Sequence, residues 1–77
     1  MDFSKAEVIW YPKTGTLVII RDGRVPDSYL AETYSDAYKF CAGYSRLNQC
    51  AVSLRSLNRF IENSFDAEGI RTSGNRY

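Results

Sequence analysis

The sequence has no histidine, and this absence argues against several function classes. Imidazole is the commonest general base and metal ligand near neutral pH, so acid–base catalysis and transition-metal binding lose their usual side chain. The two cysteines, Cys41 and Cys50, form no CxxC pair and cannot make a structural zinc site alone. We therefore expect a non-enzymatic protein with no catalytic residue, no metal site and no cofactor.

Phosphate-binding and membrane signals are also missing. The glycines at Gly15 and Gly23 are isolated in turns, and neither GxGxxG nor GxxxxGK occurs. No run approaches the ~18 apolar residues that a membrane-spanning helix needs, and the N-terminus lacks the apolar stretch of a signal peptide. We expect a cytoplasmic protein without membrane binding. Reduced, buried thiols fit this compartment, although one disulfide between Cys41 and Cys50 stays open.

The net charge is small, but the charged residues are segregated along the chain. The formal net charge of +1 gives no general attraction to polyanions. No acidic residue lies between Asp36 and Glu62, however, and that segment contains four cations: Lys39, Arg46, Arg55 and Arg59. The length of 77 residues predicts one small domain, and a homodimer would add burial that so short a chain lacks.

The N-terminal half has the pattern of an antiparallel meander. Residues 5–11 and 16–21 are rich in β-branched and aromatic side chains, and a turn containing proline and glycine separates them. Asp22-Gly23 is a tight-hairpin pair, so a third strand over about 28–33 should follow. Val25-Pro26 indicates a bulge or an edge position for this strand.

The pattern changes to helical spacing after Thr33, which can cap a helix. A first helix over about residues 36–45 is predicted by apolar residues at Ala37, Phe40, Cys41 and Tyr44. A second helix, capped by Ser53, is predicted by an apolar stripe at Leu54, Leu57, Ile61 and Phe65. Residues 46–52 stay open between a continued helix, a linker and a short fourth strand.

These elements predict an α+β fold. A small three-stranded antiparallel meander, with a short fourth strand left open, would be covered on one face by two helices. The domain would span residues 1–68, and residues 69–77 would form a polar C-terminal tail.

The basic segment supplies the candidate binding surface. On the predicted second helix Arg55 and Arg59 are one turn apart, and Arg46 lies in the connection between the helices. The predicted partner-binding residues are Tyr38, Lys39, Arg46, Arg55 and Arg59. An acidic protein surface is the favoured partner, because so few cations would hold a nucleic-acid backbone only weakly. A solvated helix surface and a small nucleic-acid-binding protein stay open as alternatives.

The predicted outer strand offers a second candidate surface. Tyr29 and Tyr34 occur there among three acidic residues: Asp27, Glu32 and Asp36. An exposed strand edge can recruit a further strand, and this acidic one could also recruit a basic partner.

The whole chain resembles the small inhibitor proteins that bacteriophages encode against host machinery, including anti-CRISPR proteins. The shared features are one compact domain, a short meander followed by helices, and no catalytic motif. The resemblance implies a viral protein that acts in the host-cell cytoplasm by occupying a partner's binding surface. It assigns no role to any individual residue.

Overall fold

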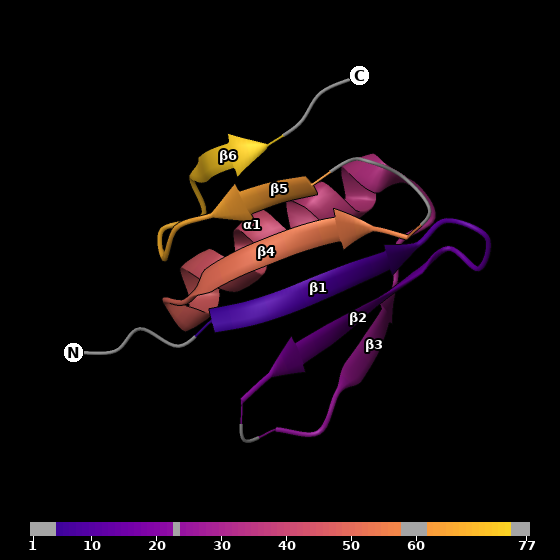
Figure 1. The fold of residues 1–77 in the computed structure, drawn as a ribbon, viewed down its shortest axis with the longest axis horizontal. Helices are drawn as coiled ribbons and strands as arrows, with labels where there is room; N and C mark the ends of the chain where they lie inside the picture. Colours follow the sequence, from indigo (N-terminus) through magenta and orange to yellow (C-terminus); the bar gives the residue numbers. More distant parts are fainter. Residues whose placement is uncertain (1–4, 23, 58–61, 75–77) are drawn as a thin grey trace.

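One mixed β-sheet and one helix make up the part of the chain that this computed structural model describes, residues 5–22, 24–57 and 62–74 (Figure 1). The elements are β1, Lys5–Tyr11; β2, Thr16–Arg21; β3, Asp27–Leu30; α1, Tyr34–Asn48; β4, Ala51–Ser56; β5, Glu62–Phe65; and β6, Arg71–Gly74. The six strands are ordered β3-β2-β1-β4-β5-β6. Two meanders therefore meet along the parallel pair β1/β4, and the other neighbouring strands are antiparallel.

The predicted fold, a three-stranded meander covered by two helices, is wrong. The described residues contain a single helix and a six-stranded mixed sheet. β1 and β2 occupy the ranges expected for the first two strands, whereas the third strand is shorter than 28–33 and ends at Leu30. The first helix is longer than predicted, and the segment from Ser53 forms β4 where a second helix was expected.

The segment predicted to begin the second helix is the strand β4, along which burial alternates with a period of two. Val52, Leu54 and Ser56 are buried, whereas Ser53 and Arg55 between them are not. This alternation is that of a strand, and β4 pairs with β1 on one side and β5 on the other. A serine at a buried position hides the alternation from a reading of hydrophobicity alone. Ile61 of the predicted helical stripe lies outside the described residues.

Local hydrogen bonds set the ends of α1. The Thr33 Oγ1 accepts a hydrogen bond from the Asp36 N–H at 3.1 Å, as expected of an N-cap residue. At the other end Gln49 has a left-handed backbone with φ 50°, a conformation that more often belongs to glycine. The helix therefore ends without a glycine signal. It takes up residues 46–48, and β4 begins at Ala51, which resolves the segment that the sequence left open.

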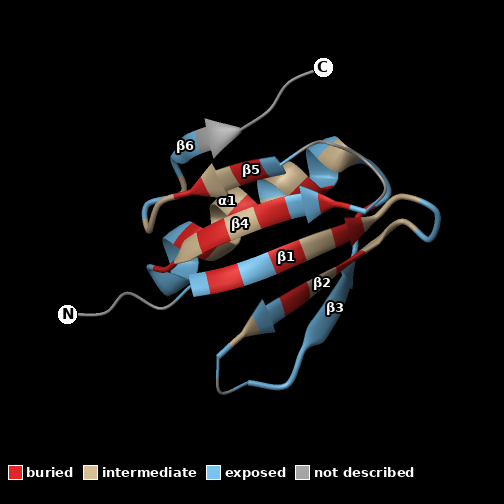
Figure 2. Ribbon diagram, in the orientation of Figure 1, coloured by how far each residue is buried: buried red, intermediate tan, exposed pale blue. Residues whose placement is uncertain are grey.

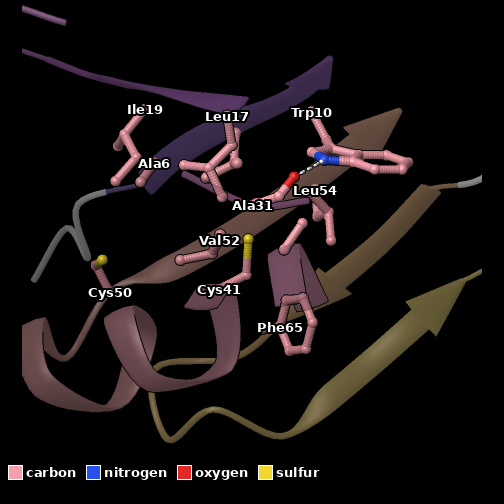
Figure 3. Packing of buried hydrophobic residues seen from close by; sticks show 12 residues of the cluster. Ala6, Trp10, Leu17, Ile19, Ala31, Cys41, Cys50, Val52, Leu54 and Phe65 are labelled. Atoms are coloured by element: carbon pink, nitrogen blue, oxygen red, sulfur yellow. Dashed lines mark hydrogen bonds between the residues drawn. The ribbon is translucent and has the colours of Figure 1, made fainter. Parts of the chain in front are cut away.

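The core lies between α1 and one face of the sheet (Figures 2 and 3). Its buried residues include, from the strands and α1, Ala6, Val8, Trp10, Leu17, Ile19, Ala37, Cys41, Val52, Leu54 and Phe65. The helix packs chiefly against β4, and also against β1 and β5. In Figure 1 α1 lies behind β4 and β5, while β2 and β3 extend beyond it. The two N-terminal edge strands thus receive less cover than the rest of the sheet.

The turn before β6 is held against the helix. Gly69 has φ +82°, and a Cβ at this position would lie 2.5 Å from the carbonyl oxygen of Ala42 in α1. Glycine is therefore needed both for the backbone conformation and for the close approach. Arg71–Gly74, which the sequence assigned to the tail 69–77, follow this turn as β6 and pair with β5.

Candidate functional site

Two of the predicted partner-binding residues, Lys39 and Arg46, lie together on the outer surface of α1. Both are exposed, and seven residues of separation place them on the same side of the helix. Gly43 lies between them, and nothing lies within 4 Å of the position that a Cβ would occupy there. We call Lys39, Gly43 and Arg46 the outer surface of α1. It is basic, but its charge comes from two side chains only.

Tyr38 contributes little to this surface because its ring is packed inward. The ring centroid lies 4.9 Å from that of Phe65 in β5, with the planes at 72°, which is an edge-to-face contact. The residue is half-buried against the core. Tyr38 therefore serves mainly to hold α1 on β5, and only part of its ring remains for a partner.

Arg55 lies on the opposite face of the sheet from α1. It belongs to β4, where its neighbours Leu54 and Ser56 point into the core and Arg55 points away. Its Nη2 forms an ion pair with Glu7 Oε1 at 3.4 Å, and about half of each side chain is exposed. Arg59 lies outside the described residues. The structure thus groups Lys39 with Arg46 but places Arg55 on a different face, beside a carboxylate.

Exposed apolar side chains gather at β3 and the residues that flank it. Val25 is 83% exposed, Leu30 82% and Tyr29 44%. Figure 2 shows β3 exposed along its whole length. Within the described sheet β3 is a terminal strand, so one side of its backbone has no neighbouring strand. We call residues 25–32 the β3 edge.

The β3 edge is exposed but firmly attached at its C-terminal end. The Trp10 Nε1–H donates a buried hydrogen bond of 2.7 Å to the carbonyl oxygen of Ala31, which is itself buried (Figure 3). The Ala31 N–H donates to the Gly15 carbonyl oxygen at 2.8 Å. Both polar groups of the Ala31 backbone are therefore satisfied inside the protein, which fixes the chain just after the exposed strand.

Aromatic rings connect the β3 edge with α1. The Tyr29 ring lies 4.9 Å from that of Phe40, and the Phe40 ring lies 6.0 Å from that of Tyr44 in a stacked orientation. The Arg21 Nη1–H donates to the Tyr44 hydroxyl at 3.3 Å, and this hydrogen bond raises the pKa of the guanidinium. Phe40 thus packs against one side of the Tyr29 ring, and the other side of that ring faces solvent.

The second predicted surface is only partly assembled. Tyr29, Asp27 and Glu32 are exposed at the β3 edge. Tyr34 instead turns into the protein, where its ring makes an edge contact with Trp10 at 5.6 Å. Its hydroxyl also accepts a hydrogen bond from the Asn63 side chain. The sequence reading missed Val25 and Leu30, for which the Val25-Pro26 edge signal was the available clue.

Both cysteines are unpaired, buried thiols. Burial raises the pKa of Cys41 to about 12, so its thiolate is scarce at neutral pH. Burial also raises the pKa of Cys50, although the charges of Arg21 and Arg24 act in the opposite direction. A nucleophilic thiol needs a lowered pKa and access to solvent, and neither cysteine has this environment.

The described residues form neither a metal site nor a membrane-spanning helix. No group of three or more histidine, cysteine or acidic side chains is arranged there to hold a metal ion. The helix is too short and too polar to cross a membrane. A hollow of ≈180 Å³ lies beside β1, β4 and β5, where Ala51, Ser53 and Ser64 are small. Its volume is below the roughly 300 Å³ of ordinary ligand pockets.

Comparisons with known proteins add no further constraint. No protein-family model matches the chain, and neither the curated proteins nor the solved structures contain a match.

Proposed function

We propose that the chain is a non-enzymatic protein-binding module whose contact surface is the β3 edge. The observation that supports this most directly is the exposure of Leu30 on β3 and of Val25 just before it, both above 80%, at a strand with no neighbour on one side within the described sheet. Burying a side chain of this size in an interface recovers about 1.5–3 kcal/mol of hydrophobic free energy. Exposed apolar side chains that gather in one place are typical of protein–protein interaction sites.

In this proposal the outer surface of α1 contributes less to partner binding than the β3 edge does. Lys39 and Arg46 are solvated cations on α1, and exposed charges of this kind contribute more to encounter rates than to affinity. The separation of Arg55 from them weakens the support for a nucleic-acid-binding protein, since no continuous row of these cations follows one face. The resemblance to phage inhibitors would fit a module that acts by occupying a partner's surface.

Affinity capture with matched variants tests this function. The immobilised protein would be exposed to an extract of the organism in which it acts, with and without nuclease. The test variant is Leu30→Ser, and the control is Leu47→Ser on α1, because Leu30 and Leu47 are 82% and 84% exposed. We expect one protein to be retained by the wild type and by Leu47→Ser but lost by Leu30→Ser, with all three equally stable. Retention by Leu30→Ser, or loss on nuclease treatment, would contradict the proposal.

A further inference from the structure

The backbone of β3 has hydrogen-bonding groups directed away from the sheet. The Ala31 N–H donates to Gly15, so Ala31 faces β2, and residues of an antiparallel strand alternate in this respect. Tyr29 and Asp27 therefore also face β2. The N–H and C=O groups of Ser28 and Leu30 point outward, where an added strand would bind. Pro26, just before β3, has no N–H and limits how far such pairing can extend.

The two faces of β3 differ in chemistry. Asp27 and Tyr29 lie opposite Ile19 and Leu17 of β2, so they are on the face that α1 covers. The face of the Tyr29 ring, which packs against Phe40, can bind a cation through a cation–π interaction. Ser28 and Leu30 lie on the other face, where Leu30 is the large apolar side chain. A strand beside β3 would thus meet acid and aromatic groups on one face and an aliphatic group on the other.

The charge of the β3 edge selects the kind of strand. Within the β3 edge both charged residues are acids, Asp27 and Glu32, and both are exposed; Asp36 follows in the first turn of α1. The nearest cation before this segment is Arg24, in the turn between β2 and β3. Pairing β3 with β3 of a second copy would bring two acidic segments within a Debye length of about 8–10 Å. Like charges oppose that pairing, and a basic strand meets no such penalty.

We infer that the β3 edge binds an extended, basic segment of a partner protein by strand addition. The partner's backbone pairs with the outward groups of Ser28 and Leu30. Its lysine or arginine side chains lie on the α1 side beside Asp27 and Tyr29, and its apolar side chains lie beside Leu30. This inference rests on the proposed function, to which it adds the partner's conformation and charge.

The probe is a short fluorescein-labelled peptide in which lysine alternates with valine, measured by fluorescence anisotropy at ~50 and ~200 mM salt. The first control peptide has glutamate in place of lysine. The second keeps every side chain but has an N-methyl group on each successive backbone nitrogen, so neither of its edges can donate hydrogen bonds to a strand. We expect both controls to bind at least about tenfold more weakly than the probe, because each loses either the charge attraction or the backbone hydrogen bonds.

Protein variants locate the site. Ser28→Pro removes one outward N–H, and Leu30→Lys adds a repelling charge, while neither change touches a hydrogen bond to β2. Both variants should lose the probe, whereas Lys39→Glu on α1 should keep it. If Ser28→Pro unfolds, Leu30→Lys still decides the matter. Equal binding of the N-methylated peptide would overturn strand addition, because charge attraction alone would then suffice.

The remaining outcomes separate this inference from the proposed function. If Leu30→Ser loses the captured protein but no peptide binds, the surface is an interface and strand addition is wrong. If capture is insensitive to Leu30→Ser and no peptide binds, both proposals fail. A protein that sediments as a dimer, and becomes monomeric with Ser28→Pro, would overturn the basic partner in favour of a second copy.

Discussion

The β3 edge and the outer surface of α1 are both exposed, yet they differ in what they offer a partner. The β3 edge combines outward backbone groups, two highly exposed aliphatic side chains and nearby acids. The outer surface of α1 has all its interior backbone groups bonded within the helix and presents two cations around Gly43. Charge is present on both surfaces. Leu47 is 84% exposed on α1, so a single apolar side chain does not distinguish the two surfaces. The β3 edge differs by a second aliphatic side chain and by backbone groups without a partner in the described sheet, and main-chain hydrogen bonds supply affinity when a strand is added.

Both surfaces are built on one core, and the reactivity of the buried Cys41 thiol, for which we expect the largest effect, tests how firmly that core is closed. With a pKa of about 12, the folded thiol is ionised roughly 10³-fold less at pH 8 than an unfolded cysteine. In a Cys50→Ala background, alkylation of Cys41 by iodoacetamide should be slower in the folded protein by at least about that factor, because the side chain is also fully buried. Raising the pH from neutral should speed the reaction, since more thiolate forms. Fast alkylation would show that the core opens readily.

Trp10→Phe should separate the two surfaces by loosening the β3 edge more than α1. The change removes the indole N–H and leaves the buried Ala31 carbonyl without its donor, a cost of about 1–3 kcal/mol. Urea unfolding measures the loss, and amide exchange should accelerate at Tyr29 more than at Cys41 in α1. Tyr34→Phe is the control, because it keeps the ring contact with Trp10 and leaves the Ala31 bond in place. Equal acceleration in both elements would contradict a separate attachment of β3.

The variant Gly43→Ala tests whether the outer surface of α1 is also an interface. Glycine in a helix interior is destabilising by about 0.5–1 kcal/mol relative to alanine, and the site has room for a Cβ. The variant should therefore be more stable by that amount in urea unfolding and should capture the same partner. Gly69→Ala is a control of opposite sign, because its Cβ would clash with Ala42. A stabilised Gly43→Ala that no longer captures the partner would give α1 the role assigned here to β3.

Reversal of the α1 charges should have a small effect. The double variant Lys39→Glu and Arg46→Glu changes exposed side chains, so the free energy of unfolding should shift by no more than about 0.5 kcal/mol. Binding of the basic peptide should change by less than about threefold at ~200 mM salt, because screening limits action from another surface. Complete loss of peptide binding would place the site on α1.

Arg55→Gln should have the smallest effect of all. The ion pair with Glu7 is exposed on both sides, and pairs of this kind contribute about 0–1 kcal/mol. We expect a change within about 0.5 kcal/mol in urea unfolding, decreasing further at high salt, and unchanged partner capture. A strong loss of capture would identify the sheet face opposite α1 as a third surface.

The first meander could be predicted because its signals are local. β1 and β2 are dense in β-branched residues, and Asp22-Gly23 marks the hairpin that leads to β3. The second meander could not, because Ser53 and Ser56 weaken the alternation of β4 and because its pairing with β1 is between residues far apart in sequence. The sequence also gives no signal for the end of α1, because the left-handed residue that follows the helix is Gln49 and not a glycine.

The candidate site was predictable to a similar extent. The outer strand with Tyr29, Asp27 and Glu32 could be recognised as an edge from Pro26 and the charge pattern. The exposure of Leu30 depends on its register opposite Thr16 at the end of the sheet, on the face away from α1, which only the assembled fold reveals. The expected grouping of Arg55 with Lys39 required a second helix, and β4 places Arg55 elsewhere.

Amide hydrogen exchange at β3, measured by NMR with and without the lysine–valine peptide, tests the central claim most directly. Strand addition predicts that the outward N–H groups of Ser28 and Leu30 exchange more slowly in the complex, while that of Lys39 in α1 is unchanged. Unchanged exchange at Ser28 and Leu30 in a peptide-saturated sample would contradict the account.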